Sequence, residues 1–110
     1  MHVISRKKLI EKSRDYPDAA TPLDTWYRIS KKAFWTNISA VRAVYPHADP
    51  VGECVVFNIG GNKYRLITHI DYAAPASGDK RAFGGRVLIF DVLNHKEYDA
   101  NKWKSKHCGC

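Results

Sequence analysis

The side chains best suited to chemistry follow the last long apolar segment of the chain. Directly after Val92 and Leu93 come Asn94, His95, Lys96, Glu97, Tyr98 and Asp99. Histidine transfers protons in either direction near neutral pH, and tyrosine does so where nearby cations depress its pKa. With a cation to stabilise charge on phosphorus, such a pair can cleave RNA through its 2′-hydroxyl without a metal. The alternative is that His95 and Tyr98, one helical turn apart, pack together and do no chemistry.

The cations for this chemistry follow a glycine turn in the middle of the chain. Residues 53–59 are β-branched and aromatic and show no helical period, which predicts a buried strand. Gly60, Gly61 and Asn62 tolerate positive φ, so the chain is expected to double back as an antiparallel hairpin.

The strand that leaves this turn is predicted to have two different faces. Alternate side chains of a strand point to opposite faces. The first face is expected to hold Tyr64, Leu66, Thr68, Ile70 and Tyr72. The second face is expected to hold Lys63, Arg65, Ile67, His69 and Asp71. Lys63, Arg65 and His69 would then stand in a row about 6 to 7 Å apart, which predicts a strip that binds phosphates. The alternative is a solvated sheet face with no specific ligand.

Helices are predicted in the N-terminal half. Residues 2–4 suggest a brief strand. Ser5 is expected to cap a first helix that runs to about residue 15, and a second helix is expected to start at Thr21 or Pro22. The buried face of that second helix is expected to hold Leu23, Trp26, Tyr27, Ser30, Ala33 and Phe34. A third helix is predicted over 37–44, with Ile38, Val41, Val44 and Tyr45 on one side. Residues 46–52 are predicted as a loop, 73–85 as a long polar connection and 86–93 as a further strand, so the sheet is expected to have at least three strands.

Length and charge restrict the class of protein. A chain of 110 residues suits one domain that needs no disulfide or metal, and its net charge of +7 favours a polyanionic partner such as nucleic acid. No apolar run reaches the roughly 18 residues of a membrane helix, and the N-terminus lacks the apolar core of a signal peptide. A cytoplasmic protein that does not enter a membrane is therefore expected.

The cysteines are Cys54, Cys108 and Cys110. An odd number, with one in a predicted buried strand and two at the C-terminus, argues against a disulfide framework. The terminal cluster with His107 lacks the paired spacing of a zinc site, so no metal is expected. The sequence predicts a single domain over residues 1–104, followed by a frayed, reduced tail over residues 105–110.

Several motifs in combination resemble the HigB family of bacterial toxins, which belongs to the RelE-like superfamily. The resemblance is carried by the hairpin over residues 58–67, by the pair Val92 and Leu93 with His95, Glu97, Tyr98 and Asp99, and by Lys102, Trp103 and Lys104. The opening residues 1–5 and the helix with Trp26 and Tyr27 are also similar, so the likeness spans most of residues 1–104.

This resemblance implies a RelE-like α+β fold, with N-terminal helices on one face of a small antiparallel sheet and an open face that binds RNA. It implies an endonuclease that cuts messenger RNA on the ribosome, needs no cofactor, and is neutralised by a helix-turn-helix antitoxin of the HigA kind. The implied catalytic residues are Arg65, His95 and Tyr98, and the implied RNA contacts are Asn62, Lys63, Lys96, Lys102 and Lys104. Glu97 and Asp99 would orient His95 or hold the end of the sheet.

Two features depart from the pattern of the family. Basic residues are expected before the Val-Leu pair, where this chain has Phe90 and Asp91, and the connection over 73–85 is longer than expected. Arg86, Lys80 or Arg81 would have to replace the missing cation, or activity would be reduced. The alternatives are a non-catalytic RNA-binding or antitoxin-partner module on the same fold, and a toxin of the superfamily that inhibits gyrase.

Overall fold

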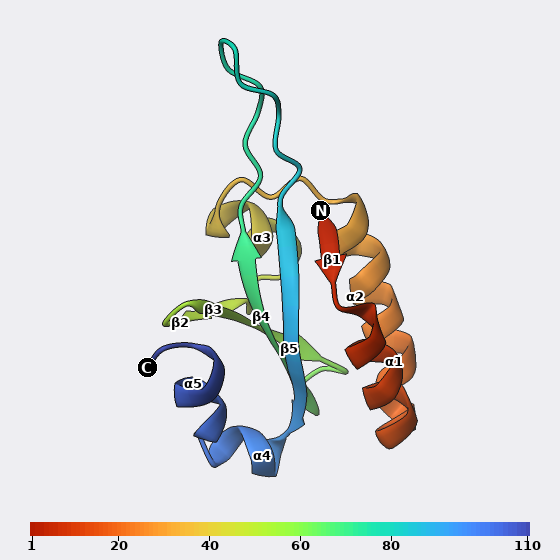
Figure 1. Ribbon diagram of the computed structural model, residues 1–110. Helices are drawn as coiled ribbons and strands as arrows, with labels where there is room; N and C mark the ends of the chain where they lie inside the picture. The colour runs from red at the N-terminus through yellow and green to blue at the C-terminus, as the bar shows by residue number, and fades with distance from the viewer.

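A five-stranded sheet forms the centre of the protein (Figure 1), and the computed structural model describes residues 1–110. The strands are β1 His2–Ile4, β2 Asp49–Val51, β3 Cys54–Ile59, β4 Tyr64–Asp71 and β5 Arg86–Asn94, in the spatial order β1-β5-β4-β3-β2. All neighbours pair antiparallel except β1, which runs parallel to β5. The predicted strands and hairpin are confirmed, and the sheet is mixed and not purely antiparallel.

Five α-helices surround this sheet, which confirms the α+β class. They are α1 Arg6–Asp15, α2 Ala20–Lys32, α3 Ile38–Val44, α4 His95–Asp99 and α5 Lys102–His107, and a 3-10 turn over Pro17–Ala19 joins α1 to α2. Ser5 precedes α1 as predicted, although its side chain makes no capping hydrogen bond. None of the helices combines the length and the apolar character needed to cross a membrane.

The main core lies between the sheet and the three N-terminal helices. Trp26 of α2 packs edge-on against Phe57 of β3, with ring centres 5.4 Å apart. Leu23, Trp26 and Ser30 are buried as predicted, but Phe34 is 50% exposed. The prediction for Phe34 is wrong because α2 ends at Lys32, so the helical period stops there and Trp35 enters the core instead.

Two further details of the N-terminal half differ from expectation. Val44 is exposed, contrary to the prediction. Val41 is the one residue of α3 that is buried in the core. The predicted loop over residues 46–52 contains strand β2, which pairs with β3 across a tight turn at Gly52. Gly52 has a φ of +56°, and a Cβ there would collide with the carbonyl of Cys108, so a turn of this shape needs glycine.

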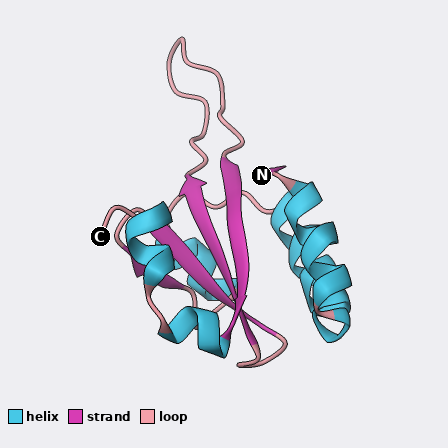
Figure 2. Cartoon of the chain, turned by 60° about the horizontal axis from the view of Figure 1, so that its bottom comes forward, coloured by secondary structure: helices cyan, strands magenta, loops and turns pink.

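The second face of the sheet is not open along its length, contrary to expectation. Helix α5 covers part of it, and a smaller core forms there from Cys54, Val56, Ile67, Leu93, Trp103 and Cys108. Figure 2 shows the sheet between the pair α1 and α2 on one side and the C-terminal helices on the other. Any open binding surface on this face is therefore confined to what α4 and α5 leave uncovered.

A disulfide joins Cys54 of β3 to Cys108 after α5, across a sequence separation of 54 residues. The predictions that no disulfide forms and that residues 105–110 fray are both wrong. The physical reason is Trp103, which is buried on the sheet and brings the end of α5 against β3, where the amide of Glu53 also donates to the carbonyl of Cys108 at 2.9 Å. Cys110 alone is free and exposed.

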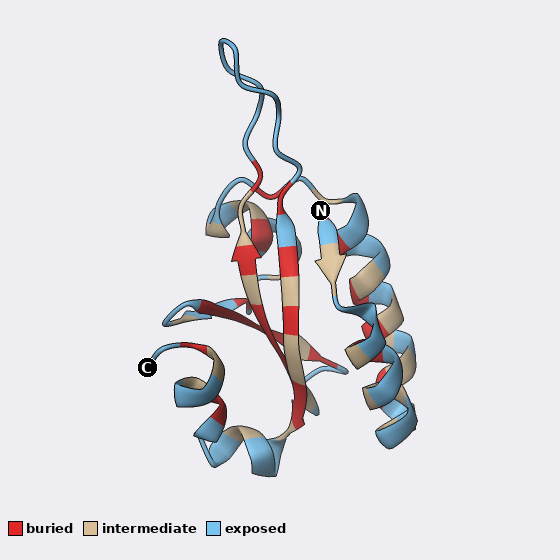
Figure 3. Ribbon diagram, viewed as in Figure 1, coloured by how far each residue is buried: buried red, intermediate tan, exposed pale blue.

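The connection between β4 and β5 projects from the sheet as a narrow arm. Its two sides pair at Ala74 with Phe83 and at Ser77 with Lys80. It is exposed along most of its length, as predicted, and lies at the end of the sheet opposite to α4 (Figure 3). Lys80 and Arg81 therefore stand far from the His95–Asp99 segment and cannot replace a cation missing beside it.

Candidate functional site

An open hollow lies where β4 begins and α4 follows β5. It encloses about 400 Å³ and takes its polar lining from the side chains of Arg42, His47, Asp49, Asn58, Arg65 and Tyr98. These residues come from five elements, α3, β2, β3, β4 and α4, and from the turn before β2, so the hollow exists only once the sheet has formed. Its lining holds two guanidinium groups against one carboxylate, which favours an anionic ligand.

Arg65 is held by the backbone at the edge of the hairpin turn. Its Cα pairs with that of Asn58 on β3 and that of Leu93 on β5. The Nη1 atom donates to the carbonyls of Asn62 at 3.0 Å and Tyr64 at 3.2 Å. Because Nε and Nη2 make no hydrogen bond within the chain, they remain available to a phosphate, which guanidinium groups bind through two parallel bonds.

Tyr98 contacts this guanidinium and is fixed by a tryptophan. The guanidinium carbon of Arg65 lies 5.1 Å from the centre of the Tyr98 ring, within the range of a cation–π contact. The ring also stacks on Trp103 at 5.1 Å with an angle of 14° between the planes. The indole of Trp103 donates to the carbonyl of Tyr98 at 3.0 Å, whereas the hydroxyl of Tyr98 has no partner in the chain.

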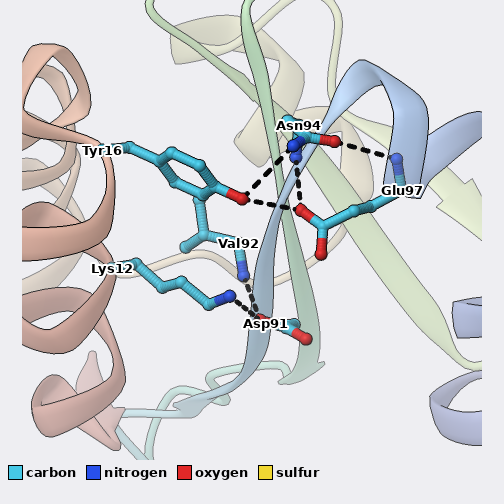
Figure 4. A network of polar contacts seen from close by, with 6 residues as sticks. All are labelled: Lys12, Tyr16, Asp91, Val92, Asn94 and Glu97. Carbon is cyan, nitrogen blue, oxygen red and sulfur yellow. Dashed lines mark hydrogen bonds and ion pairs between the residues drawn. The ribbon is translucent and has the colours of Figure 1, made fainter.

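A polar network fixes the start of α4 (Figure 4). Asn94 caps the helix by accepting from the amide of Glu97 at 2.9 Å, and Glu97 accepts from the amide of Asn94 at 3.2 Å. The hydroxyl of Tyr16 donates to Glu97 at 2.8 Å, and the side-chain amide Nδ2 of Asn94 donates to that hydroxyl at 3.3 Å. Beside this network, Lys12 pairs with Asp91 at 3.3 Å.

This network has a clear electrostatic consequence for Tyr16. Desolvation, together with the hydrogen bond and the charge of Glu97, raises the pKa of Tyr16 to about 12. Glu97 therefore holds the end of the sheet, one of the two roles expected for it. The sequence does not indicate this role of Tyr16, because its partner lies 81 residues away.

The predicted strip of Lys63, Arg65 and His69 is not formed. Lys63 pairs at 3.4 Å with Asp18 beside α2, and the hydroxyl of Tyr64 donates to the same carboxylate at 2.5 Å. These two contacts, with the Tyr64 bond the larger cause, lower the pKa of Asp18. His69 is bonded to the carbonyl of Glu53 at 2.6 Å and to Asp71 at 3.1 Å. Alternation along β4 is as predicted, but each of the three side chains has a different partner.

His95 lies on the surface, outside the hollow. It is the first residue of α4, is exposed, and makes no hydrogen bond. The side chain of Asn62 accepts from Asn58 at 3.3 Å, and Asn62 lines a hollow that shares His47 and Asn58 with the first one. Of the expected catalytic residues, the structure thus brings together Arg65 and Tyr98.

A second hollow of about 340 Å³ lies between β5, α4 and α5. Among its lining residues are Leu93, Lys96, Lys102, Trp103, Lys106 and His107. The two carboxylates in its wall, Asp91 and Glu97, are already bound to Lys12 and Tyr16, while none of its three lysines has an acidic partner. Phe90, which stands where a basic residue was expected, stacks on His107 with ring centres 4.9 Å apart and so fills a structural place.

The stacked rings of Tyr98 and Trp103 stand between the two hollows, and cations lie on both sides of them. Lys96, Lys102 and Lys106 lie on one side of this stacked pair and Arg65 on the other, and Lys104 lies over the Trp103 ring at 5.7 Å. Fold and site together define a small basic α+β protein equipped to bind a polyanion such as RNA.

Comparison with known proteins identifies the family. The sequence model of the family HigB_toxin, described as the RelE-like toxic component of a toxin-antitoxin system, matches residues 19–101. This chain belongs to the HigB toxin family, which confirms the resemblance seen in the sequence.

Relatives of known name agree with this assignment. An "mRNA interferase HigB" of Escherichia coli O6:H1 (strain CFT073) is 30% identical over 102 residues, which cover 90% of this chain and 89% of the relative. The "mRNA interferase toxin HigB" of Escherichia coli K12 is 28% identical over 102 residues, which cover 90% of this chain and 88% of the relative.

Proposed function

We propose that this toxin is an endoribonuclease that cleaves messenger RNA and so stops translation. The observation that carries the proposal is the pairing of Arg65 and Tyr98 in one open hollow, with free guanidinium donors and a free hydroxyl. The names of the relatives, which are called mRNA interferases, support the same activity.

The chemistry proposed for the hollow is attack of the RNA 2′-hydroxyl on the neighbouring phosphorus. Arg65 binds the scissile phosphate through Nε and Nη2 and stabilises the charge that develops on it. Tyr98 acts at the same phosphate through its hydroxyl or stacks on a base. His95 lies outside the hollow, one helical turn before Tyr98 on α4, and we propose that it takes the proton of the 2′-hydroxyl from that side of the bound RNA. The products are a 2′,3′-cyclic phosphate and a 5′-hydroxyl.

The RNA strand is proposed to continue from this hollow over α4 into the second one. Lys96 and Lys102 line that hollow without acidic partners, and Lys104 lies beside Trp103, so all three are free to bind flanking phosphates. Asn62 lies at the other end of the path. We assign no phosphate to Lys63, because its ammonium group pairs with Asp18.

The partners of this reaction follow from the family. A toxin of a toxin-antitoxin system has an antitoxin, and we propose a helix-turn-helix protein of the HigA kind as the partner. We further propose that the messenger RNA is cut on the ribosome, in the cytoplasm.

Primer extension on a reporter messenger RNA in a purified translation system tests this function. Wild type is expected to produce cuts that weaken in Arg65→Ala, Tyr98→Ala and His95→Ala, with all variants folded by circular dichroism. Arg28→Ala is the matched control, since Arg28 is an exposed arginine paired with Asp24 on α2. Absence of cuts by wild type, with and without ribosomes, would instead indicate a non-catalytic RNA-binding or antitoxin-partner module.

A further inference from the structure

A histidine with no assigned role lines the hollow. His47 lies in the turn between α3 and β2, is exposed, and makes no hydrogen bond with the rest of the chain. It lines both the hollow with Arg65 and Tyr98 and the adjoining one with Asn58 and Asn62. The sequence does not indicate a role for it, because residues around it come from β3, β4 and α4.

The strand pairing places His47 and Tyr98 on opposite sides of Arg65. Asp49, two residues after His47, pairs with Val56 on β3, and Asn58 farther along β3 pairs with Arg65 on β4. The order across the hollow is thus His47, Asn58, Arg65 and Tyr98. Two strand spacings, about 10 Å, separate the backbones of β2 and β4, which leaves room for a phosphodiester between the flanking side chains.

Cleavage through the 2′-hydroxyl needs proton transfer on both sides of the phosphorus. The attacking 2′-oxygen and the leaving 5′-oxygen lie on opposite sides of the phosphorus, so one group cannot serve both in a single step. If the base lies on α4, the acid must come from the far side of Arg65. His47 is the proton-donating side chain that the structure places there.

We propose that His47 is the general acid of the cleavage reaction, an inference that rests on the proposed function. A base on α4 takes the proton of the 2′-hydroxyl as the bond from the 2′-oxygen to phosphorus forms. The bond from phosphorus to the 5′-oxygen breaks, and the 5′-oxygen receives a proton from the imidazolium of His47. Neutral His47 then regains a proton from solvent.

The charged groups around His47 fit this role. Arg42, Asp49, Arg65 and Tyr98 line the same hollow, and Arg42 is fixed by a bond from Nε to the carbonyl of Ala48 at 3.0 Å. The phosphate of the RNA brings negative charge that offsets the two arginines beside the imidazole.

The test compares two messenger RNAs on programmed ribosomes, each with one linkage of interest at the mapped cleavage position. One has the natural 5′-oxygen, and the other has a 5′-sulfur, which leaves without being protonated. His47→Gln is expected to slow cleavage of the natural linkage by about 10²-fold or more, and to cut the sulfur linkage near the wild-type rate. His2→Gln, an exposed histidine on the edge strand β1, is the control.

The remaining outcomes separate the two proposals. Equal slowing of both linkages by His47→Gln, or no slowing of either, overturns the role of His47 while the nuclease itself stands. Failure of the wild type to cut either RNA overturns the proposed function, and the role of His47 with it. Circular dichroism of His47→Gln excludes misfolding as the cause of slowing.

Discussion

The hydroxyl of Tyr16 donates a 2.8 Å hydrogen bond to Glu97, which joins the N-terminal helices to the start of α4. Glu97 uses the same oxygen to accept from the amide of Asn94, so one carboxylate caps the helix and receives the tyrosine. Tyr98 is the next residue. The position of the aromatic ring beside Arg65 therefore depends on a contact with the opposite end of the chain.

This contact predicts a loss of stability at high pH. The raised pKa of Tyr16, about 12, means that the folded state holds the phenolic proton more tightly than the unfolded chain, whose tyrosines titrate near 10. The stabilisation is complete below about pH 10 and is lost as the pH rises toward 12. Urea unfolding at pH 9 and pH 11 should show Tyr16→Phe less stable than wild type at pH 9, with a smaller difference at pH 11.

The comparison with Tyr16→Phe isolates one tyrosine among several. Tyr45, Tyr64 and Tyr72 also have raised pKa values, by burial or by the bond of Tyr64 to Asp18, so wild type and variant share their titration. A difference between the two proteins that stays constant with pH would contradict the prediction.

Arg65→Lys is expected to separate charge from geometry. Lysine keeps the positive charge but loses the planar fork and the stacking on Tyr98, so cleavage should fall by about 10²-fold while RNA binding changes little. Single-turnover rates and binding constants at fixed salt measure the two effects. Arg28→Lys should leave both unchanged, and an active Arg65→Lys enzyme would show that the fork is not used.

Removing the Cys54–Cys108 disulfide should destabilise the fold. It closes a loop with a sequence separation of 54 residues, for which loss of unfolded-chain entropy gives about 2 to 4 kcal/mol. Cys108→Ser should show this loss in urea unfolding. Cys110→Ser, which changes the free and exposed cysteine, should stay within about 0.5 kcal/mol of wild type. Equal stability of the two variants would show that the bond contributes nothing.

The local pattern of the sequence predicted most of the elements. The β-branched run before Gly60 and the alternation after it depend on neighbours in the chain, and both strands form as expected. The resemblance implied Arg65 and Tyr98 as residues of one site, and the structure brings their side chains together.

Contacts between distant segments were not visible in the sequence. Three features depend on how helices and strands pack against one another in the folded protein. They are the disulfide between Cys54 and Cys108, the network from Tyr16 to Glu97, and the position of His47. Alternation assigns a face to a side chain but not a partner. Lys63 was predicted to bind phosphate beside Arg65, but its ammonium group forms an ion pair with Asp18.

The arm between β4 and β5 should be removable. Ala74 and Phe83 exchange two hydrogen bonds of 2.8 Å, the arrangement that closes a two-residue hairpin. Replacing residues 75–82 by Asn-Gly should leave a folded protein within about 1 kcal/mol of wild type, since loop length affects stability weakly. Cleavage should be unchanged, because the hollow lies at the other end of the sheet. A loss of cleavage by the folded variant would instead place the arm against the ribosome or the RNA.

The two outer strands of the sheet limit how partners can attach. β1 and β2 have three residues each, and β2 includes Pro50, which has no amide hydrogen to donate. A strand offered by another chain would find few backbone groups to pair with along either border. An antitoxin is therefore expected to recognise this toxin through its side chains, and the short borders also disfavour edge-to-edge aggregation of toxin copies.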